Sequence, residues 1–184
     1  PWSDQDYIPP TTDEDKKVLL FWGFINSRIN FEYLFLLADK LHSVSSKYEI
    51  HLVGPIDRIQ SKILKKIHEN EKIKLIPPCK LENLDFSQVL ASFIPYLEGK
   101  KENDVTSIPN KALPMLANGL PILITGMPNF IDEPFVYRLC EKIDTDLNLI
   151  KKVEEDFFLI QPSIINFLNQ NSSKSRLNQF LSYL

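Results

Sequence analysis

Short apolar runs alternate with longer amphipathic or polar segments along most of the chain, and this alternation constrains the fold more than any other feature. The connections between successive runs are too long for hairpins, so the runs are expected to pair in parallel, with helices on both faces of the sheet. We therefore predict an α/β fold with a Rossmann-like parallel sheet of about six strands. The expected strands are residues 18–22, 48–53, 73–76, 92–96, 120–125 and 135–139.

The strand order follows from the rules for parallel sheets. Right-handed crossovers and one reversal of direction give the order 3-2-1-4-5-6. The reversal falls between the strand before Gly23 and the strand that ends at Tyr96. Ligands of such sheets bind beyond the carboxyl ends of the strands at the reversal. The loops at 23–29 and 97–111 should therefore face each other and form the site.

Apolar residues at helical spacing predict helices between and after the strands. Asn30 is expected to cap the first of them. In the last one, Leu177, Phe180, Leu181 and Leu184 form an apolar stripe that packs either on this domain's sheet or toward another domain. Residues 97–105 are expected to be a polar loop. The helices are expected at residues 30–44, 57–69, 85–91, 146–158, 162–168 and 172–184.

The segment 106–126, TSIPNKALPMLANGLPILITG, is predicted to form a short helix, a glycine turn and a buried strand. Ser107 is expected to cap this helix, with Pro109 near its first turn. Lys111 would then place a cation beside the free amides of the helix N-terminus, an arrangement that binds anions. An ordinary αβ unit with a solvated lysine is the open alternative.

Gly23 and Arg28, in the loop after the first strand, also suit a phosphate. Gly23 has no Cβ, so the backbone can approach a ligand closely, and a guanidinium can bind a diphosphate through two hydrogen bonds. If the loops converge, Arg28 and Lys111 would stabilise the charge that grows on a leaving nucleoside diphosphate. A turn glycine and a surface arginine are the alternatives. The GxGxxG pattern of dinucleotide oxidoreductases is absent from the sequence.

Composition narrows the class of protein. With 184 residues the chain can form one domain with a sizeable core, and its net charge of −3 implies no attraction to nucleic acid. The sequence has no apolar run of membrane-spanning length, and Cys79 and Cys140 form no disulfide framework, so we expect a reducing, cytoplasmic location. No His, Cys, Asp or Glu cluster has metal-ligand spacing, so we expect neither metal nor cofactor.

The first 16 residues are rich in proline and acidic residues and have no periodicity, which is typical of a linker. We therefore expect residues 1–16 to be an interdomain linker, 17–145 a Rossmann-like domain and 146–184 C-terminal helices. The helices would pack on this domain or reach toward a missing N-terminal domain. The chain is accordingly expected to be the second half of a longer protein.

The sequence PNKALPMLANGLPILIT at 109–125 is similar to the PxKxxExxAxGxPVV stretch in the nucleotide-sugar half of GT-B glycosyltransferases. The closest similarity is to family-4 enzymes of the teichuronic-acid and capsule type. KVLLFWGFINSRINFEYL at 17–34 resembles their first strand and glycine loop, and SFIPYLEGKKENDVTSIPNK at 92–111 resembles their IxPYxxNxxTxxxxPxK segment. Residues 1–10 look like their interdomain linker.

The resemblance implies the C-terminal, donor-binding half of a GT-B enzyme. Such an enzyme transfers a sugar from a nucleoside-diphosphate sugar to a saccharide or lipid-linked acceptor in surface-polysaccharide synthesis. It would work in the cytoplasm, at the inner face of the membrane, with peripheral membrane contact through the full-length protein. The resemblance places no catalytic residue in this half, and this half alone should be inactive. The donor-binding residues that it implies are Gly23, Arg28, Ser107, Asn110, Lys111 and Pro114.

Two positions depart from the family pattern. Family-4 enzymes typically carry two glutamates eight positions apart, and Thr106 and Pro114 stand at those positions here. Neither residue can act as a carboxylate, and Pro114 should kink its helix by removing the bond to Asn110. Glu98 or Glu102 could replace the lost carboxylate from the loop. A catalytically degenerate GT-B-like binding or scaffolding module is therefore the main alternative, and a flavodoxin-like or receiver domain is a weaker one.

Overall fold

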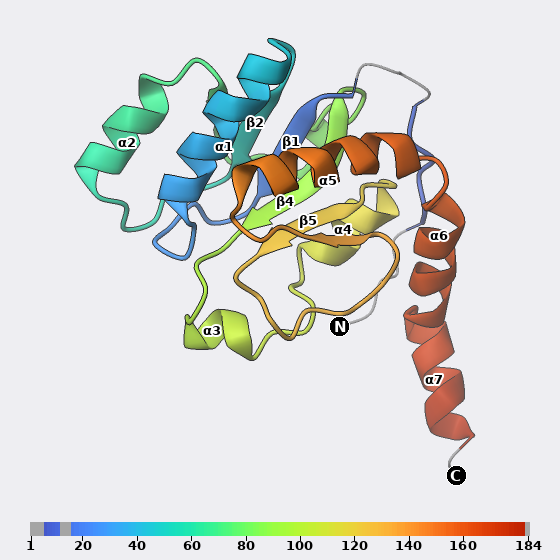
Figure 1. The fold of residues 1–184 in the computed structure, drawn as a ribbon. Coiled ribbons are helices and arrows are strands. Elements are labelled where there is room, and N and C mark those ends of the chain that lie inside the picture. Colours follow the sequence, from blue (N-terminus) through green and yellow to red (C-terminus); the bar gives the residue numbers. More distant parts are fainter. Residues whose placement is uncertain (1–5, 12–15, 183–184) are drawn as a thin grey trace.

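The structure, a computed structural model, describes residues 6–11 and 16–182, which contain a six-stranded sheet with the order β3-β2-β1-β4-β5-β6 (Figure 1). Every neighbouring pair of strands runs parallel. The Rossmann-like sheet and its strand order are therefore confirmed. The strands are β1 (Val18–Trp22), β2 (Glu49–Val53), β3 (Ile73–Ile76), β4 (Val89–Pro95), β5 (Ile122–Thr125) and β6 (Val136–Arg138).

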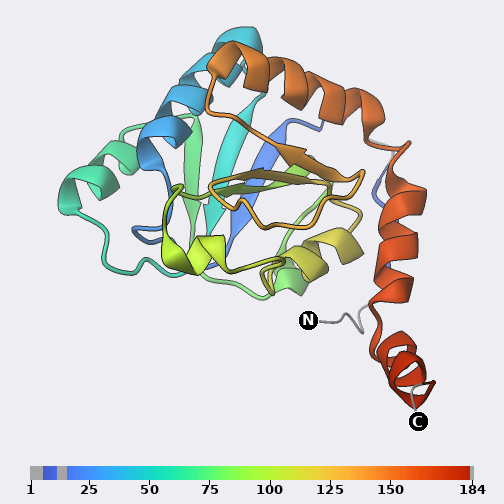
Figure 2. The same ribbon diagram turned by 60° about the horizontal axis from the view of Figure 1, so that its bottom comes forward.

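Helices cover both faces of this sheet. α1 and α5 lie on one face, where both contact β4, and α4 lies on the other (Figures 1 and 2). No helix within the described residues is long and apolar enough to cross a membrane. The helices are α1 (Phe31–Val44), α2 (Ser61–His68), α3 (Lys101–Asp104), α4 (Ala112–Ala117), α5 (Ile143–Asp156), α6 (Gln161–Gln170) and α7 (Ser173–Leu181), with a 3₁₀ turn η1 (Leu81–Asn83).

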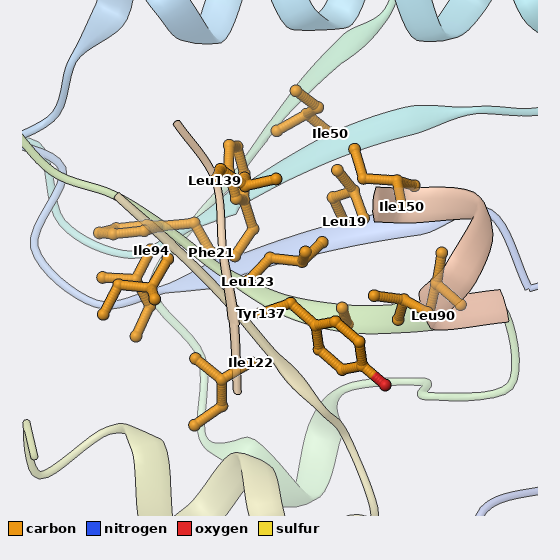
Figure 3. Packing of buried hydrophobic residues seen from close by; sticks show 14 of the residues in the cluster. Leu19, Phe21, Ile50, Leu90, Ile94, Ile122, Leu123, Tyr137, Leu139 and Ile150 are labelled. Carbon is orange, nitrogen blue, oxygen red and sulfur yellow. The ribbon is translucent and has the colours of Figure 1, made fainter. Parts of the chain in front are cut away.

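Side chains of β1 alternate between two apolar clusters. Leu19 and Phe21 belong to the larger one, together with side chains of α1 and α5, and Val18 and Leu20 belong to the smaller one with Met115 of α4. Figure 3 shows Leu19 and Phe21 packed beside residues of β4, β5 and α5. Burial on both faces explains why this strand reads as a continuous apolar run rather than an alternating one.

The loops after β1 and β4 meet at the reversal of strand order, as the topology predicts. Ile29 and Tyr96 form an antiparallel bridge, and the Leu97 amide donates a hydrogen bond to the Arg28 carbonyl at 2.8 Å. The Asn30 amide likewise donates to the Pro95 carbonyl at 2.8 Å. These bonds hold the two loops edge to edge at the carboxyl ends of the strands.

The helix predicted at 85–91 is wrong. Asp85 accepts a hydrogen bond from the Ser87 amide at 2.9 Å, which fixes a turn in place of a helix. β4 already begins at Val89, which is in register with Val18 of β1. Strand pairing therefore prevails over the helical spacing of apolar residues in this segment.

α2 is shorter than predicted, whereas α1 begins where it was expected. α2 starts at Ser61 because Arg58 has a φ of 54°, a left-handed backbone that interrupts a helix. α1 follows Asn30, whose side chain accepts a hydrogen bond from the Tyr33 amide at 3.1 Å. The loop at 97–105, predicted to be irregular, contains the short helix α3.

The described part of the expected linker packs against the domain. The Ile8 amide donates a hydrogen bond to the Ala117 carbonyl of α4 at 2.7 Å, and the Tyr7 hydroxyl bonds to Gln161 of α6 at 2.7 Å. Residues 1–5 and 12–15 of that linker lie outside the described residues. At least the segment 6–11 is therefore attached to α4 and α6.

The tail helix α7 points away from the sheet (Figures 1 and 2). Leu177, Phe180 and Leu181 of the predicted apolar stripe are 56%, 62% and 55% exposed. Leu184, the fourth residue of the stripe, lies outside the described residues. The described part of the stripe therefore does not pack on this domain's sheet.

Core positions should dominate the stability of the domain. Leu34 in α1 and Ile122 in β5 are fully buried, so Leu34→Ala and Ile122→Ala should each lower the free energy of unfolding by about 2–5 kcal/mol. Leu36→Ala is the matched control, because Leu36 is 47% exposed in the same helix and should change it by about 0.5 kcal/mol or less. Urea unfolding measures all three. Equal losses at positions 34 and 36 would contradict the orientation of α1.

Candidate anion and nucleotide site

The candidate site lies beyond the carboxyl ends of β1 and β4, where three elements bring Tyr96, Lys111 and Arg28 together. Tyr96 follows β4, Lys111 immediately precedes α4, and Arg28 belongs to the loop after β1. The Lys111 Nζ donates a hydrogen bond to the Tyr96 hydroxyl at 2.7 Å. The Arg28 Cζ lies 4.4 Å from the centroid of the Tyr96 ring. Arg28 and Lys111 therefore converge on Tyr96, as the loop positions predict.

Lys111 is half-buried as a residue, but its amine is enclosed by aromatic side chains. The Nζ lies 3.8 Å from the centroid of the Phe21 ring and 4.5 Å from that of Tyr96. Burial, and secondarily the nearby Arg28 guanidinium, hold the pKa of Lys111 well below its ordinary value. Stacking on two ring faces opposes this effect, because it favours the ammonium form. Among the described residues, no carboxylate forms an ion pair with Lys111 or with Arg28.

Arg28 is held by a buried amide that the sequence analysis did not single out. The Arg28 Nε donates a hydrogen bond to the Oδ1 of Asn103 at 2.8 Å, and the Asn103 Nδ2 donates to the Leu97 carbonyl at 2.8 Å. Asn103 lies in α3 and is fully buried. A neutral amide orients the guanidinium without neutralising it, so the positive charge stays available to an anion.

A mostly apolar pocket of about 450 Å³ opens beside Lys111. Of the residues predicted to bind the donor, Gly23, Asn110, Lys111 and Pro114 line it. Arg28, which lies against the Tyr96 ring, and Ser107 do not line it. The remaining wall comes from the ends of the first three strands: Trp22, Phe24, Gly54, Pro55, Pro78 and Cys79. The pocket thus joins one cation to a wall that suits a flat, weakly polar group.

Glycine is required where the loops after β1 and β2 meet. Gly23 has a φ of 142°, and a Cβ there would lie 3.6 Å from the Lys111 Cδ. Gly54 has a φ of 144°, and a Cβ there would collide with the Gly23 carbonyl. Both residues have a backbone that side chains with a Cβ rarely adopt. This pair of glycines lets the two loops close the floor of the pocket.

The expected cap at Ser107 is wrong, and Pro114 explains the difference. Because Pro114 has no N–H to donate to the Asn110 carbonyl, the helix starts later, at Ala112, with Lys111 in the cap position and no side-chain cap. Pro114 therefore lies in the first turn of α4, where amides have no partner within the helix. The predicted kink of a longer helix does not arise. α4 has only six residues, so its N-terminus offers little to an anion compared with the two cations.

Glu98 and Glu102 do not replace the missing carboxylates in the pocket beside Lys111. Glu98 lines a separate pocket of about 240 Å³ at the ends of β5 and β6, with Arg138, Cys140 and Glu141. Glu102 lies outside the residues that line either pocket. Within the described part of the chain, no group of three or more His, Cys, Asp or Glu side chains could hold a metal ion.

The chain is similar to known proteins in fold but not in sequence. No protein-family model matches the chain, and no curated protein matches it. The solved structure of TarM of S. aureus matches 98% of this chain and 37% of its own, with a TM-score of 0.66 and 12% identity. The lipopolysaccharide outer core galactosyltransferase WaaB matches 100% of this chain and 54% of its own, with a TM-score of 0.63 and 14% identity.

A third structure, Anabaena HepE in complex with UDP, matches 96% of this chain and 54% of its own, with a TM-score of 0.65 and 12% identity. The chain thus spans about a third to a half of the length of these three structures. Together with the strand order, this likeness shows a Rossmann-like domain of the kind that forms one half of a GT-B glycosyltransferase.

The enclosed amine of Lys111 should cost stability in a pH-dependent way. Between its lowered pKa in the folded state and about 10.4, the unfolded chain binds more protons, so this lysine makes stability rise with pH. Lys111→Met should therefore raise the free energy of unfolding at pH 7, by roughly 1–3 kcal/mol, the usual range for relieving one poorly solvated polar group.

This gain should shrink as the pH approaches 10, and urea unfolding of wild type and variant between pH 7 and 10 measures it. Lys151→Met is the control, because Lys151 is exposed on α5. The difference in free energy of unfolding between this variant and wild type should not change with pH. A flat difference for Lys111→Met would instead mean that the amine is charged and well solvated.

Proposed function

We propose that this chain is the donor-binding half of a glycosyltransferase, a domain that holds a nucleoside-diphosphate sugar. One observation carries the proposal: two cations that have no carboxylate partner among the described residues meet at the strand-order reversal, and one of them, Lys111, lines an apolar pocket. Lys111 and Arg28 would bind the diphosphate, and the wall formed by Trp22, Phe24 and Pro55 would take the base. The likeness to a structure in complex with UDP supports this assignment.

The proposed chemistry is electrostatic. As the bond between sugar and diphosphate breaks, negative charge grows on the leaving nucleoside diphosphate, and a guanidinium and an ammonium held in place stabilise it without reorganisation. Gly23 and Asn110 would complete the phosphate site from the backbone and the side chain. In this proposal the acceptor, a saccharide or a lipid-linked one, is bound by another domain, and the reaction takes place between the two.

The proposal also covers the organisation of the whole protein. Residues 1–16 would link this domain to an N-terminal one, and residues 17–145 would form the donor-binding domain. Of the helices from 146, α5 and α6 pack on this domain, and α7 would extend toward its partner. The exposed Leu177, Phe180 and Leu181 of α7 support this last point, because the described residues of this domain leave more than half of each side chain uncovered. Work at the cytoplasmic face of a membrane, on surface polysaccharide, with no metal or cofactor, belongs to the same proposal.

A catalytically degenerate binding module is the second candidate, favoured by Thr106 and Pro114. The Thr106 hydroxyl donates a hydrogen bond to the Glu102 carbonyl at 2.7 Å and offers no carboxylate. Pro114 lines the pocket with an apolar ring where a ribose-binding glutamate would stand in the family that the sequence resembles. Such a module would keep the fold and lose nucleotide affinity.

Binding of UDP or GDP separates the two candidates. Arg28→Ala should weaken the binding of UDP or GDP about tenfold or more, since a charge-assisted hydrogen bond contributes roughly 1.5–3 kcal/mol. Isothermal calorimetry measures the affinity, and Arg176→Ala in α7 is the control that removes an equal charge away from the site. Absence of any binding of either nucleotide at millimolar concentration would favour the degenerate module.

Pro114→Glu tests whether the ribose lacks an anchor. The wild-type domain should discriminate poorly between UDP and pyrophosphate, whereas the variant should bind UDP more tightly by roughly 1.5–3 kcal/mol and pyrophosphate equally well. The melting temperature should change little, because Pro114 lies in the first turn of α4, where its missing N–H costs little. Equal changes for UDP and pyrophosphate would show that position 114 does not face the ribose.

A further inference from the structure

The side chain of Tyr96 contacts both cations of the candidate site. Its hydroxyl accepts the hydrogen bond of the Lys111 Nζ at 2.7 Å, and its ring lies 4.4 Å from the Arg28 Cζ. The same ring meets Phe21 edge to face, with centroids 6.2 Å apart. Because Phe21 also lies under the Lys111 Nζ, the two rings and the amine form one packed group.

The position of Tyr96 is fixed by three strands. Its backbone carbonyl accepts a hydrogen bond from the Thr125 hydroxyl of β5 at 2.8 Å, and its backbone bridges to Ile29 after β1. Gly126, with a φ of 63°, packs so closely against this carbonyl that a Cβ there would collide with it. Tyr96 therefore cannot shift without moving the ends of β1, β4 and β5 together.

The hydroxyl of Tyr96 is also the hydrogen-bond partner of the Lys111 Nζ among the described residues. Among the described residues the Lys111 ammonium has no carboxylate partner, and its neighbour is a guanidinium, so it needs a hydrogen-bond acceptor to stay charged. Without the hydroxyl, only the faces of the Phe21 and Tyr96 rings would stabilise it. The phenol oxygen therefore favours the state of Lys111 that attracts an anion.

We propose that Tyr96 is a positioning residue of the donor-phosphate site, which fixes the separation of Arg28 and Lys111 and keeps the Lys111 amine protonated for binding. This inference rests on the proposed function, because it assumes that the two cations bind a diphosphate. It goes beyond that function by assigning the affinity and its pH dependence to a residue that itself carries no charge.

The pH dependence of diphosphate binding depends on which group at the site loses a proton between pH 7 and 9. Arg28 lies against the Tyr96 ring, and Cys79, which follows β3, lines the same pocket as Lys111. Burial raises the pKa of Tyr96, an effect that Arg28 partly opposes, so Tyr96 stays a neutral phenol between pH 7 and 9. The pKa of Lys111 is lowered, so its amine loses its proton as the pH rises, and diphosphate affinity should fall on the alkaline side.

Calorimetric titration of UDP at pH values from 7 to 9 tests the proposal, because the phosphates of UDP are almost fully ionised above their second pKa of about 6. At pH 8, Tyr96→Phe should bind UDP about fivefold or more weakly than wild type. Its alkaline loss of affinity should begin at a lower pH. Tyr137→Phe is the matched control, since it removes a hydroxyl bonded to Asp156 on another element and should change neither quantity.

Two further variants identify the titrating group. Lys111→Arg should bind UDP with no alkaline loss, because a guanidinium stays charged at these pH values. Cys79→Ala should keep the alkaline loss of wild type. An alkaline loss that persists in Lys111→Arg, or vanishes in Cys79→Ala, would overturn the assignment to Lys111 and with it the role of Tyr96.

The outcomes separate this inference from the proposed function. If wild type binds no UDP, the proposed function fails and the inference falls with it. If wild type binds UDP but Tyr96→Phe has the same affinity and the same pH profile, only the inference is overturned. A uniform loss of affinity with an unshifted pH profile would indicate a merely structural tyrosine and would also overturn it. Should Tyr96→Phe fail to fold, Tyr96→Met, which keeps bulk without a hydroxyl, is subject to the same criteria.

Discussion

The contact between the Lys111 amine and the Tyr96 hydroxyl is the interaction on which the site depends, because it joins the start of α4 to the end of β4. The reversal of the strand order between β1 and β4 brings the loop after β1, with Arg28, to the same place. There Arg28 donates a hydrogen bond to Asn103 of α3, which orients its guanidinium. β1 with the loop that follows it and the residue before α4 thus converge on one aromatic ring.

Such an arrangement is unfavourable for folding and favourable for binding. Two neighbouring cations that have no carboxylate partner in the described part of the chain repel each other and lose hydration, so the fold must supply a rigid support. The fully buried Phe21, which contacts both the Lys111 amine and the Tyr96 ring, provides it, together with the glycines that close the pocket floor. In the proposed function an incoming diphosphate relieves the repulsion between the two cations. The repulsion that lowers the stability of the free domain therefore strengthens binding of the ligand.

Periodicity in the sequence predicts the sheet because burial on both faces leaves a simple pattern, and all six strands lie within a few residues of their expected positions. The start of α4 was missed because one absent N–H, that of Pro114, decides it. The turn at Asp85 was missed because a single side-chain hydrogen bond competes with helical spacing. The roles of Asn103 and Tyr96 depend on contacts between distant segments, and the only local hint was the position of Tyr96 directly after an apolar strand.

The chemistry of the pocket limits how a nucleotide could be held in the proposed function. Pro114 and the wall of Trp22, Phe24 and Pro55 offer apolar surface and no carboxylate, so ribose hydroxyls would find little there to accept their hydrogen bonds. Glu98, a candidate replacement, lines the separate pocket beside β5 and β6. Most of the specific binding free energy must then come from the two cations, and such energy is sensitive to salt. A domain of this kind recognises the diphosphate first and the nucleoside mainly by shape, which is the reverse of a site anchored on the ribose.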